Sequence, residues 1–251
     1  MSGNGAPQSI RELSKEELVQ WVIEGFRRTL VHYGYWFKEV ENRVGFEDAC
    51  VIENEAGDRL LGTVLKRLSA IFDIPLEGGL PGSLRDMGRE ELLVLMEENS
   101  KNWLACDGLW FLGVESRYGM ESAKHCNDTC WSRFAPYEAL RIKTRLGMPA
   151  SPGLEGLKTA FGFRMYAMIN KQSIEQVDSN SFIFRMNECR VQSTRKAKGL
   201  PDYPCKSAGI VEFPTFARSI DERIRTECVG CPPDEHPEEW FCAWKFIMDD
   251  R

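Results

Sequence analysis

The chain has 251 residues, of which 43% are hydrophobic and 28% are charged, and these values are typical of a folded globular protein. No run approaches the roughly 18 consecutive apolar residues that a membrane-spanning helix requires. A formal net charge of −6 disfavours binding to nucleic acid, because phosphate neutralisation requires clustered Lys and Arg side chains. The composition therefore predicts a soluble protein without a nucleic-acid or membrane partner.

The start of the chain, residues 1–8, is small and polar. It lacks both the positive charge and the apolar stretch of a secretion signal. A protein without such a signal is expected in the cytoplasm, where its nine cysteines would stay mostly reduced. An odd number of cysteines also argues against complete disulfide pairing. Metal ligation is therefore favoured over disulfide formation as the role of these thiols.

Two segments of the front half of the chain resemble each other. A shift of 74 residues aligns residues 13–75 with residues 87–149 without a gap, and 17 of the 63 positions are identical. Average residue usage gives about four identities by chance. The identical pairs include Gly34/Gly108, Trp36/Trp110, Phe37/Phe111, Gly45/Gly119 and Pro75/Pro149. We interpret this similarity as an internal duplication of one structural unit.

Each copy is predicted to form a helical hairpin. Ser14 and Glu17 have the spacing of a capping box, and the apolar residues that follow recur at helical intervals. Gly45 is expected to end the first helix, and a second helix is predicted over residues 46–72. Residues 75–88, rich in Pro and Gly, would link the two copies, and residues 149–153 form the next break. A helical region is therefore expected over residues 9–150.

The second copy differs from the first at polar positions. Asp107 occupies the position of Tyr33 in the first copy. Glu121 and His125 are four residues apart, so they share one helix face, where they would suit a second metal or an acid/base pair. A surface pair without a function is the alternative interpretation. Three aromatic residues likewise fit either helix packing or a substrate-binding box: Trp103, Trp110 and Phe111.

Residues 151–251 are predicted to form an α/β domain that binds a metal and a ligand. A helix over residues 154–170 precedes two strands, over 173–177 and 181–191, in which apolar residues alternate with polar ones. Another helix is expected from Pro204 toward Ser219, with Pro214 bending it or ending it early. Strands over residues 223–229 and 240–248 follow. The order β-β-α-β-β predicts an antiparallel sheet with a helix across one face, and the whole chain is expected to be α+β.

A basic segment lies between the second predicted strand and this helix. Its cations are Arg190, Arg195, Lys196, Lys198 and Lys206, against Asp202 as the acid. Such a concentration of positive charge could attract an organic anion. A solvated charged face is the alternative.

Five of the nine cysteines lie in the last 63 residues: Cys189, Cys205, Cys228, Cys231 and Cys242. Thiolates bind zinc tetrahedrally in sets of three or four, so this cluster predicts a zinc site. Cys205 is expected at a helix N-terminus, where the helix dipole favours the thiolate. Core packing is the alternative for any single cysteine. An iron–sulfur cluster, or thiol exchange through Cys228-Val-Gly-Cys231, is the alternative for the group.

The cysteine pattern of residues 154–248 resembles that of the 4-vinyl reductase type domain. The similarity lies in Cys205 before a helix, Cys228 at the end of a strand, and Cys242-Ala-Trp-Lys-Phe in the next strand. It implies a small-molecule-binding α/β module in which three such cysteines and one carboxylate hold zinc beside an aromatic-lined pocket. Cys189, Cys231 and Glu188 then compete for the fourth ligand position.

Residues 87–248 are also similar to uncharacterised bacterial proteins related to aminothiazoline-carboxylate hydrolases. This second similarity lies in Asn102-Trp-Leu-Ala-Cys-Asp-Gly-Leu-Trp-Phe and in Cys228-Val-Gly-Cys-Pro-Pro-Asp. It implies a cytoplasmic protein and leaves the substrate open.

Two functions are therefore expected from the sequence. The first is a binding protein, in which cysteine-held zinc supports a pocket for an aromatic or anionic small molecule. The alternative is a metal- or thiol-dependent hydrolase of a small heterocyclic or carboxylate substrate, with Asp107, Glu121 and His125 as the available acid/base groups. The sequence has no phosphate-binding glycine loop, Gly-x-Ser-x-Gly or His-Glu-x-x-His motif. A homo-oligomer is compatible with either function.

Overall fold

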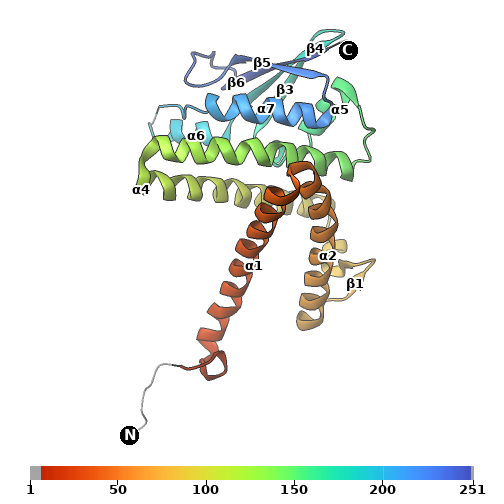
Figure 1. The fold of residues 1–251 in the computed structure, drawn as a ribbon, viewed down its shortest axis with the longest axis vertical. Helices are drawn as coiled ribbons and strands as arrows, with labels where there is room; N and C mark the ends of the chain where they lie inside the picture. Colours follow the sequence, from red (N-terminus) through yellow and green to blue (C-terminus); the bar gives the residue numbers. More distant parts are fainter. Residues whose placement is uncertain (1–6, 200, 250–251) are drawn as a thin grey trace. The chain divides into compact units, whose positions relative to one another are not determined.

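A computed structural model describes residues 7–199 and 201–249 of the chain (Figure 1). The chain separates into two compact units, the first ending at Phe72 and the second beginning at Asp73. Among the described helices, none is both long enough and apolar enough to cross a membrane. The fold is α+β, as the sequence predicts: long helices precede a four-stranded antiparallel sheet with packed helices.

The first unit is a hairpin of two long helices, α1 (Lys15–Val44) and α2 (Phe46–Phe72), preceded by the short 3-10 helix η1 (Ile10–Glu12). The predicted capping box is present at the start of α1: Glu17 N donates to Ser14 Oγ, and Ser14 N donates to Glu17 Oε2. Gly45 separates the two helices with φ 91° and ψ 167°, a conformation that essentially only glycine adopts. The predicted helix end is confirmed.

Few side chains of this hairpin are buried. Tyr33 Oη donates to Glu53 Oε1 at 2.7 Å and joins α1 to α2. In the described structure no residue of α1 is buried, and α2 buries Ala49, Cys50 and Ser69. The hairpin therefore has no hydrophobic core of its own.

The second unit begins with a small β-hairpin, β1 (Leu76–Glu77) and β2 (Leu80–Pro81), and the single-turn helix α3 (Gly82–Arg85). Helix α4 (Arg89–Arg145) follows and is interrupted at Gly119, which has φ 83° and ψ 171°. Shifted by 74 residues, α1 corresponds to residues 89–118, the first arm of α4, and Gly45 corresponds to Gly119. The two copies thus share the same helix, glycine, helix arrangement, which supports the interpretation of an internal duplication.

The rest of the second unit holds the sheet. Its elements are α5 (Gly153–Phe161), the 3-10 helix η2 (Met165–Met168), β3 (Lys171–Asp178), β4 (Ser181–Glu188), α6 (Arg190–Ala197), α7 (Lys206–Ile220), β5 (Ile224–Gly230) and β6 (Cys242–Met248). The helix expected over residues 154–170 is divided into α5 and η2. The strand expected to reach residue 191 ends at Glu188, because α6 starts two residues later.

Helix α7 passes through Pro214 and ends at Ile220, close to the predicted end at Ser219, so of the two outcomes expected at Pro214 the early end does not occur. Proline inside a helix costs about 3 kcal/mol. The inner face of α7 buries Phe213, Phe216 and Ile220. Each buried side chain of this size contributes about 1.5–3 kcal/mol, so their burial outweighs the loss of one hydrogen bond.

All neighbouring strands of the sheet are antiparallel, in the order β3-β4-β6-β5. In the central pair Phe182 lies opposite Phe246, Phe184 opposite Trp244, and Met186 opposite Cys242. Since alternate residues share a face, these residues form one apolar surface, and the end of β4 meets the start of β6.

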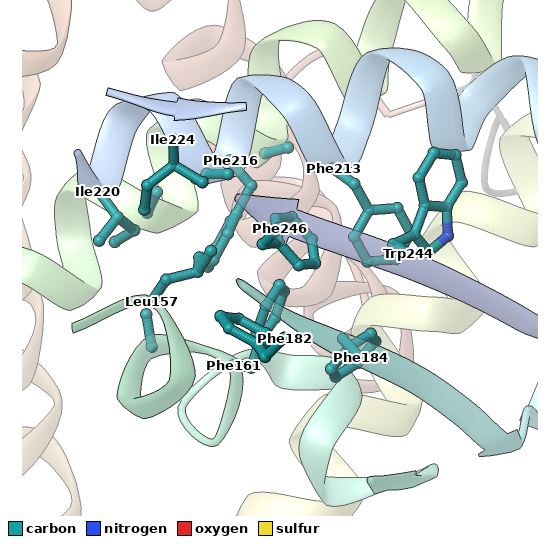
Figure 2. Close-up of a cluster of buried hydrophobic side chains, with 14 of the residues drawn as sticks. Leu157, Phe161, Phe182, Phe184, Phe213, Phe216, Ile220, Ile224, Trp244 and Phe246 are labelled. Carbon is teal, nitrogen blue, oxygen red and sulfur yellow. The ribbon is translucent and has the colours of Figure 1, made fainter. Parts of the chain in front are cut away.

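The core lies between this surface and helices α5 and α7 (Figure 2). Phe161 of α5 stacks on Phe184 with ring centroids 4.3 Å apart, and Phe213 of α7 stacks on Trp244 at 4.7 Å. Such aromatic contacts add about 0.5–1.5 kcal/mol each beyond simple burial. The core thereby fixes α7 across the sheet.

Helix α7 also packs against α4, so the second unit has three layers: the sheet, α7 and α4 (Figure 1). The fully buried Ala135 and Ala139 of α4 are small, which permits the close approach of the two helices. The expected boundary near residue 150 lies between α4 and α5. The compact units divide at Phe72, and the second helical copy belongs to the same unit as the sheet because α4 packs on α7.

Candidate functional site

The five cysteines of the C-terminal region lie at one end of the covered sheet face. Cys242 begins β6, and Cys228 is near the end of β5. Cys189 and Cys205 immediately precede α6 and α7, and Cys231 follows β5. Because the end of β5 pairs with the start of β6, the fold gathers side chains that are up to 53 residues apart in the chain.

A turn after β5 brings Cys231 to the start of α7. Asp234 N donates to the carbonyl oxygen of Cys231 at 2.9 Å, and Lys206 N donates to that of Pro232 at 2.8 Å. The ammonium group of Lys206 also pairs with Asp234 at 2.7 Å. The two contacts of Lys206, the residue next to Cys205, hold the turn against the start of α7 and so fix the distance between the two cysteines.

The thiols of Cys205 and Cys231 are in direct contact, with their Sγ atoms 3.5 Å apart. A hydrogen bond from Cys231 lowers the pKa of Cys205, and Gln192 Nε2 adds a second hydrogen bond to Cys205 Sγ at 3.6 Å. The same contact with Cys205 raises the pKa of Cys231, and an interaction with the Cys242 thiol acts in the same direction. The pair therefore favours a thiolate on Cys205 and a proton on Cys231.

Cys189 and Cys228 lie at the edge of this group. Burial raises the pKa of Cys189 to about 12 and also raises that of Cys228. Among the residues that the structure describes, no group of three or more His, Cys, Asp or Glu side chains is arranged so that it could hold a metal ion. Metal binding would therefore require a change of side-chain rotamer in the cluster, whose donor atoms are nevertheless those that zinc prefers.

Four of these cysteines line a cavity of about 500 Å³: Cys189, Cys205, Cys231 and Cys242. Another part of its wall is a stripe on the first arm of α4, formed by Lys101, Leu104, Ala105, Asp107, Gly108, Phe111, Leu112 and Glu115. Their spacing of three and four residues places these side chains on one helix face. The volume is sufficient for a small organic ligand.

Aromatic rings form much of the remaining wall. Trp131 of the second arm of α4 stacks on Tyr166 with centroids 5.5 Å apart, and Phe111 meets the Tyr203 ring edge-on at 5.4 Å. Trp103 packs against Trp131 and Tyr166 behind this wall. Trp103 is thus a packing residue, whereas Phe111 faces the cavity.

Gln192 fixes the segment that carries Tyr203. Its Nε2 donates to the Tyr203 carbonyl at 2.9 Å, and its Oε1 accepts from Tyr203 N at 2.8 Å. Because this buried amide also contacts Cys205, it connects the cavity wall with the thiol pair.

A buried ion triad supports the same wall from beneath. Arg164 lies between Glu138 and Glu212, with 2.8 Å separating its guanidinium from a carboxylate oxygen of each. Burial raises the pKa of Glu212, which lines the cavity.

Several residues singled out from the sequence lie elsewhere. Glu188 is exposed and forms an ion pair with Lys171, so the structure does not bring it to the cysteines. Glu121 and His125 are exposed on α4 and do not line the cavity. Trp110 is 72% exposed. Of the expected acid/base groups, Asp107 lies in the cavity wall.

Sequence reasoning missed Gln192, Arg164 and Glu212 as residues of the site. A single polar residue in a mixed sequence has no periodicity that would reveal burial. The stripe on α4 did carry a signal, since residues 101–115 have helical spacing, but that spacing does not tell which partner the helix face meets.

Residues 11–87 and 84–248 match the protein family described as "Family of unknown function (DUF6125)". The first match covers the first copy of the duplicated segment, and the second match covers the other copy together with the sheet. No curated protein and no solved structure matches the chain significantly.

Proposed function

Since this chain belongs to a family of unknown function, we propose its function from the cavity: it is a small-molecule-binding protein whose cavity wall contains a cysteine cluster that holds zinc. The observation that carries the proposal is the position of four cysteines in the wall of an aromatic-lined cavity of about 500 Å³. Ligand sites in proteins are commonly apolar cavities with a few converging polar groups.

The contact between Cys205 and Cys231 supports the zinc part of the proposal. Two thiolates on one zinc ion, each about 2.3 Å from it in a tetrahedral arrangement, are separated by about 3.8 Å. The Sγ separation of 3.5 Å is close to this value. The thiolate favoured on Cys205 is also the protonation state that binds metal. A zinc ion held here would join the turn after β5 to the start of α7 and so stabilise the cavity wall.

We also propose that the second unit is related to the 4-vinyl reductase type domain, which its cysteine pattern resembles. Two features support it: the order of elements along the chain, in which two strands, helix α7 and two further strands follow one another with the short α6 before α7, and the cysteines before α7, in β5 and in β6. Under this proposal the second unit would be a ligand-binding module. We likewise propose that residues 87–248 are related to aminothiazoline-carboxylate hydrolases.

Hydrolysis is the second candidate function, and the lowered pKa of Cys205 favours it. A cysteine nucleophile also requires a general base within hydrogen-bonding reach. The hydrogen-bonding partners of the Cys205 thiol among the described residues are Cys231 and Gln192. His125 and Glu121 are outside the cavity wall, so the geometry supports binding better than hydrolysis.

Metal analysis of protein purified without chelator tests the proposed zinc site. We expect about one zinc ion per chain in the wild type, measured by inductively coupled plasma mass spectrometry. Cys231→Ser should contain clearly less zinc and should unfold about 5 °C or more below the wild type, since losing each kcal/mol lowers Tm by about 2–4 °C at this size. Cys126→Ser, at an exposed thiol on α4, is the matched control and should leave both values unchanged.

A wild-type protein free of zinc, or a Cys231→Ser variant with unchanged zinc content, would contradict the zinc site. Cys228→Ser and Cys189→Ser, measured beside Cys231→Ser, identify which of the five thiols complete the ligand set. We expect the larger zinc loss from Cys231→Ser, because Cys231 contacts both Cys205 and Cys242.

A further inference from the structure

Asp107 lies in the stripe of α4 that faces the cavity. Leu104 precedes it by three residues and Phe111 follows it by four, so an apolar side chain lies on each side of the carboxyl group along the helix. Asp107 forms no hydrogen bond or ion pair with any described residue, and burial raises the pKa of its carboxyl group. An unpaired carboxyl group in an apolar wall is costly unless a ligand pairs with it.

The other acidic groups next to the cavity leave an excess of negative charge. Glu212 lines the cavity, but its partner Arg164 is shared with Glu138. One guanidinium thus serves two carboxylates. Asp107, Glu138 and Glu212 are therefore three acidic side chains near the single guanidinium of Arg164, and Glu115 adds a further carboxylate to the cavity wall.

The cations that line the cavity have other neighbours. Lys101 pairs with Glu97 at 2.7 Å and with Glu98 at 2.8 Å. Arg195 Nε donates to the carbonyl oxygen of Pro201 at 2.8 Å. Arg190 is exposed and lies close enough to Glu97 to lower its pKa. Among the described residues, none of these three cations pairs with Asp107, so its carboxylate is left for a cationic ligand in place of the expected anion.

The walls around Asp107 suit a cation attached to an apolar body. Five aromatic residues line the cavity: Phe111, Trp131, Tyr166, Tyr203 and Phe213. The faces of aromatic rings attract organic cations, and aromatic cages with a carboxylate bind ammonium groups in many proteins.

We propose that the cavity binds a small primary amine carried on an apolar or aromatic scaffold, with Asp107 as the counter-ion of its ammonium group. This inference rests on the proposed small-molecule function of the same cavity and does not require zinc. The rings would enclose the scaffold, and the carboxylate of Asp107 would accept hydrogen bonds from the ammonium group.

Three probes of the same shape test the proposal by isothermal titration calorimetry: phenethylamine, phenethyl alcohol and hydrocinnamate. They present a cation, a neutral group and an anion at the same end of one aromatic scaffold. We expect the amine to bind the wild type about tenfold or more tightly than either of the others, since a hydrogen bond to a charged group is worth at least this factor.

Asp107→Asn should reduce the affinity for phenethylamine about tenfold or more and leave that for phenethyl alcohol within about twofold. Asp86→Asn makes the same change at an exposed aspartate outside the cavity wall and should have no effect. The Asp107→Asn variant should fold at least as stably as the wild type, because it removes the charge of a partly buried carboxyl group that has no partner among the described residues. Thermal unfolding of both variants checks this.

The proposal fails if hydrocinnamate binds as tightly as the amine, if none of the probes binds at millimolar concentration, or if Asp107→Asn retains its affinity for the amine. The first two of these outcomes concern the wild type alone, so they decide the question even if the Asp107→Asn variant misfolds. Zinc measured in the same samples separates the two proposals. Amine selectivity without zinc refutes only the metal site, and zinc without amine selectivity refutes only this inference.

Discussion

Gly45 and Gly119 make the same chain reversal in the two copies of the duplicated segment. Their φ and ψ angles agree within about 10°, at 91° and 167° for Gly45 and 83° and 171° for Gly119. Residues with a Cβ atom rarely adopt this conformation. Apart from the adjoining backbone and the two chain neighbours, no heavy atom lies within 4 Å of the position that a Cβ would take at either glycine. Glycine is therefore required at both positions because of the backbone conformation, and not because a side chain would clash with a neighbour.

Replacing Gly119 by Ala should destabilise the protein by about 1–3 kcal/mol, the cost of holding alanine in this conformation. Gly113→Ala is the matched control, because Gly113 is inside the same helix and its Cβ would also meet open space. That change should stabilise by about 0.5–1 kcal/mol. Denaturant unfolding followed by circular dichroism measures both. Equal effects of the two substitutions would contradict the backbone explanation.

At the scale of elements, Asp221 joins three segments of the second unit. Its side chain accepts a hydrogen bond from Gly153 N at the start of α5, at 2.9 Å. It also accepts from Arg223 N at 3.2 Å and pairs with the Arg223 guanidinium at 2.8 Å, beside the start of β5. Asp221 itself follows the last residue of α7. Hydrogen bonds from Arg223 lower the pKa of the buried Asp221 carboxyl from 3.8 to about 2.

Stability should depend on pH through this group. Because the pKa is lower in the folded state, the native protein favours the carboxylate. The stabilisation is complete above pH 3.8 and is lost as pH falls toward about 2. A difference of this size corresponds to about 2 kcal/mol. Asp221→Asn should therefore lower the free energy of unfolding by about that amount at neutral pH, with a difference that shrinks below pH 4.

Glu222→Gln provides the matched control, because it removes a carboxylate from the exposed neighbouring residue. Its unfolding free energy should follow that of the wild type at every pH. A difference between Asp221→Asn and wild type that stayed constant from neutral to acidic pH would show that the carboxylate charge is not the source of the stabilisation.

The elements also show where sequence patterns succeed. Gly45, the capping box at Ser14 and the alternation of Phe182, Phe184 and Met186 are local signals, and each predicted the element that forms. Helix α6 was missed because its residues are mostly polar and charged, so it has no apolar periodicity to reveal it. The helix predicted toward Ser219 does pass through Pro214, and burial of the inner face of α7 offsets the cost of the proline.

At the scale of the whole molecule, the two units differ in how much they bury. The second unit contains the aromatic core of the sheet, α5 and α7. The first unit buries three residues of its two helices, while many of its large apolar side chains are exposed, Trp36 by 62% among them. Helices derive most of their stability from burying an apolar face.

Fragments that divide the chain at Phe72 should therefore behave differently. Residues 73–251 should fold alone, with cooperative thermal unfolding and a near-ultraviolet dichroism signal from packed aromatic rings. Residues 1–72 should be partly helical and should melt without cooperativity, because they lack a core. Cooperative unfolding of the short fragment, or loss of the near-ultraviolet signal in the long one, would contradict this division.

The sequence alone determined the fold class, the duplication and the boundaries of the long helices, because glycine, capping and periodicity act between residues that are close in the chain. It also identified the cysteines of the C-terminal region as candidate metal ligands, since thiolates are among the ligands that zinc prefers. Tertiary structure decided which of these groups meet. The pairing of β5 with β6 and the turn at Pro232 place Cys231 against Cys205. The packing of α4 on α7 gives Asp107 a cavity to face, and such contacts depend on distances between remote segments that no local pattern contains.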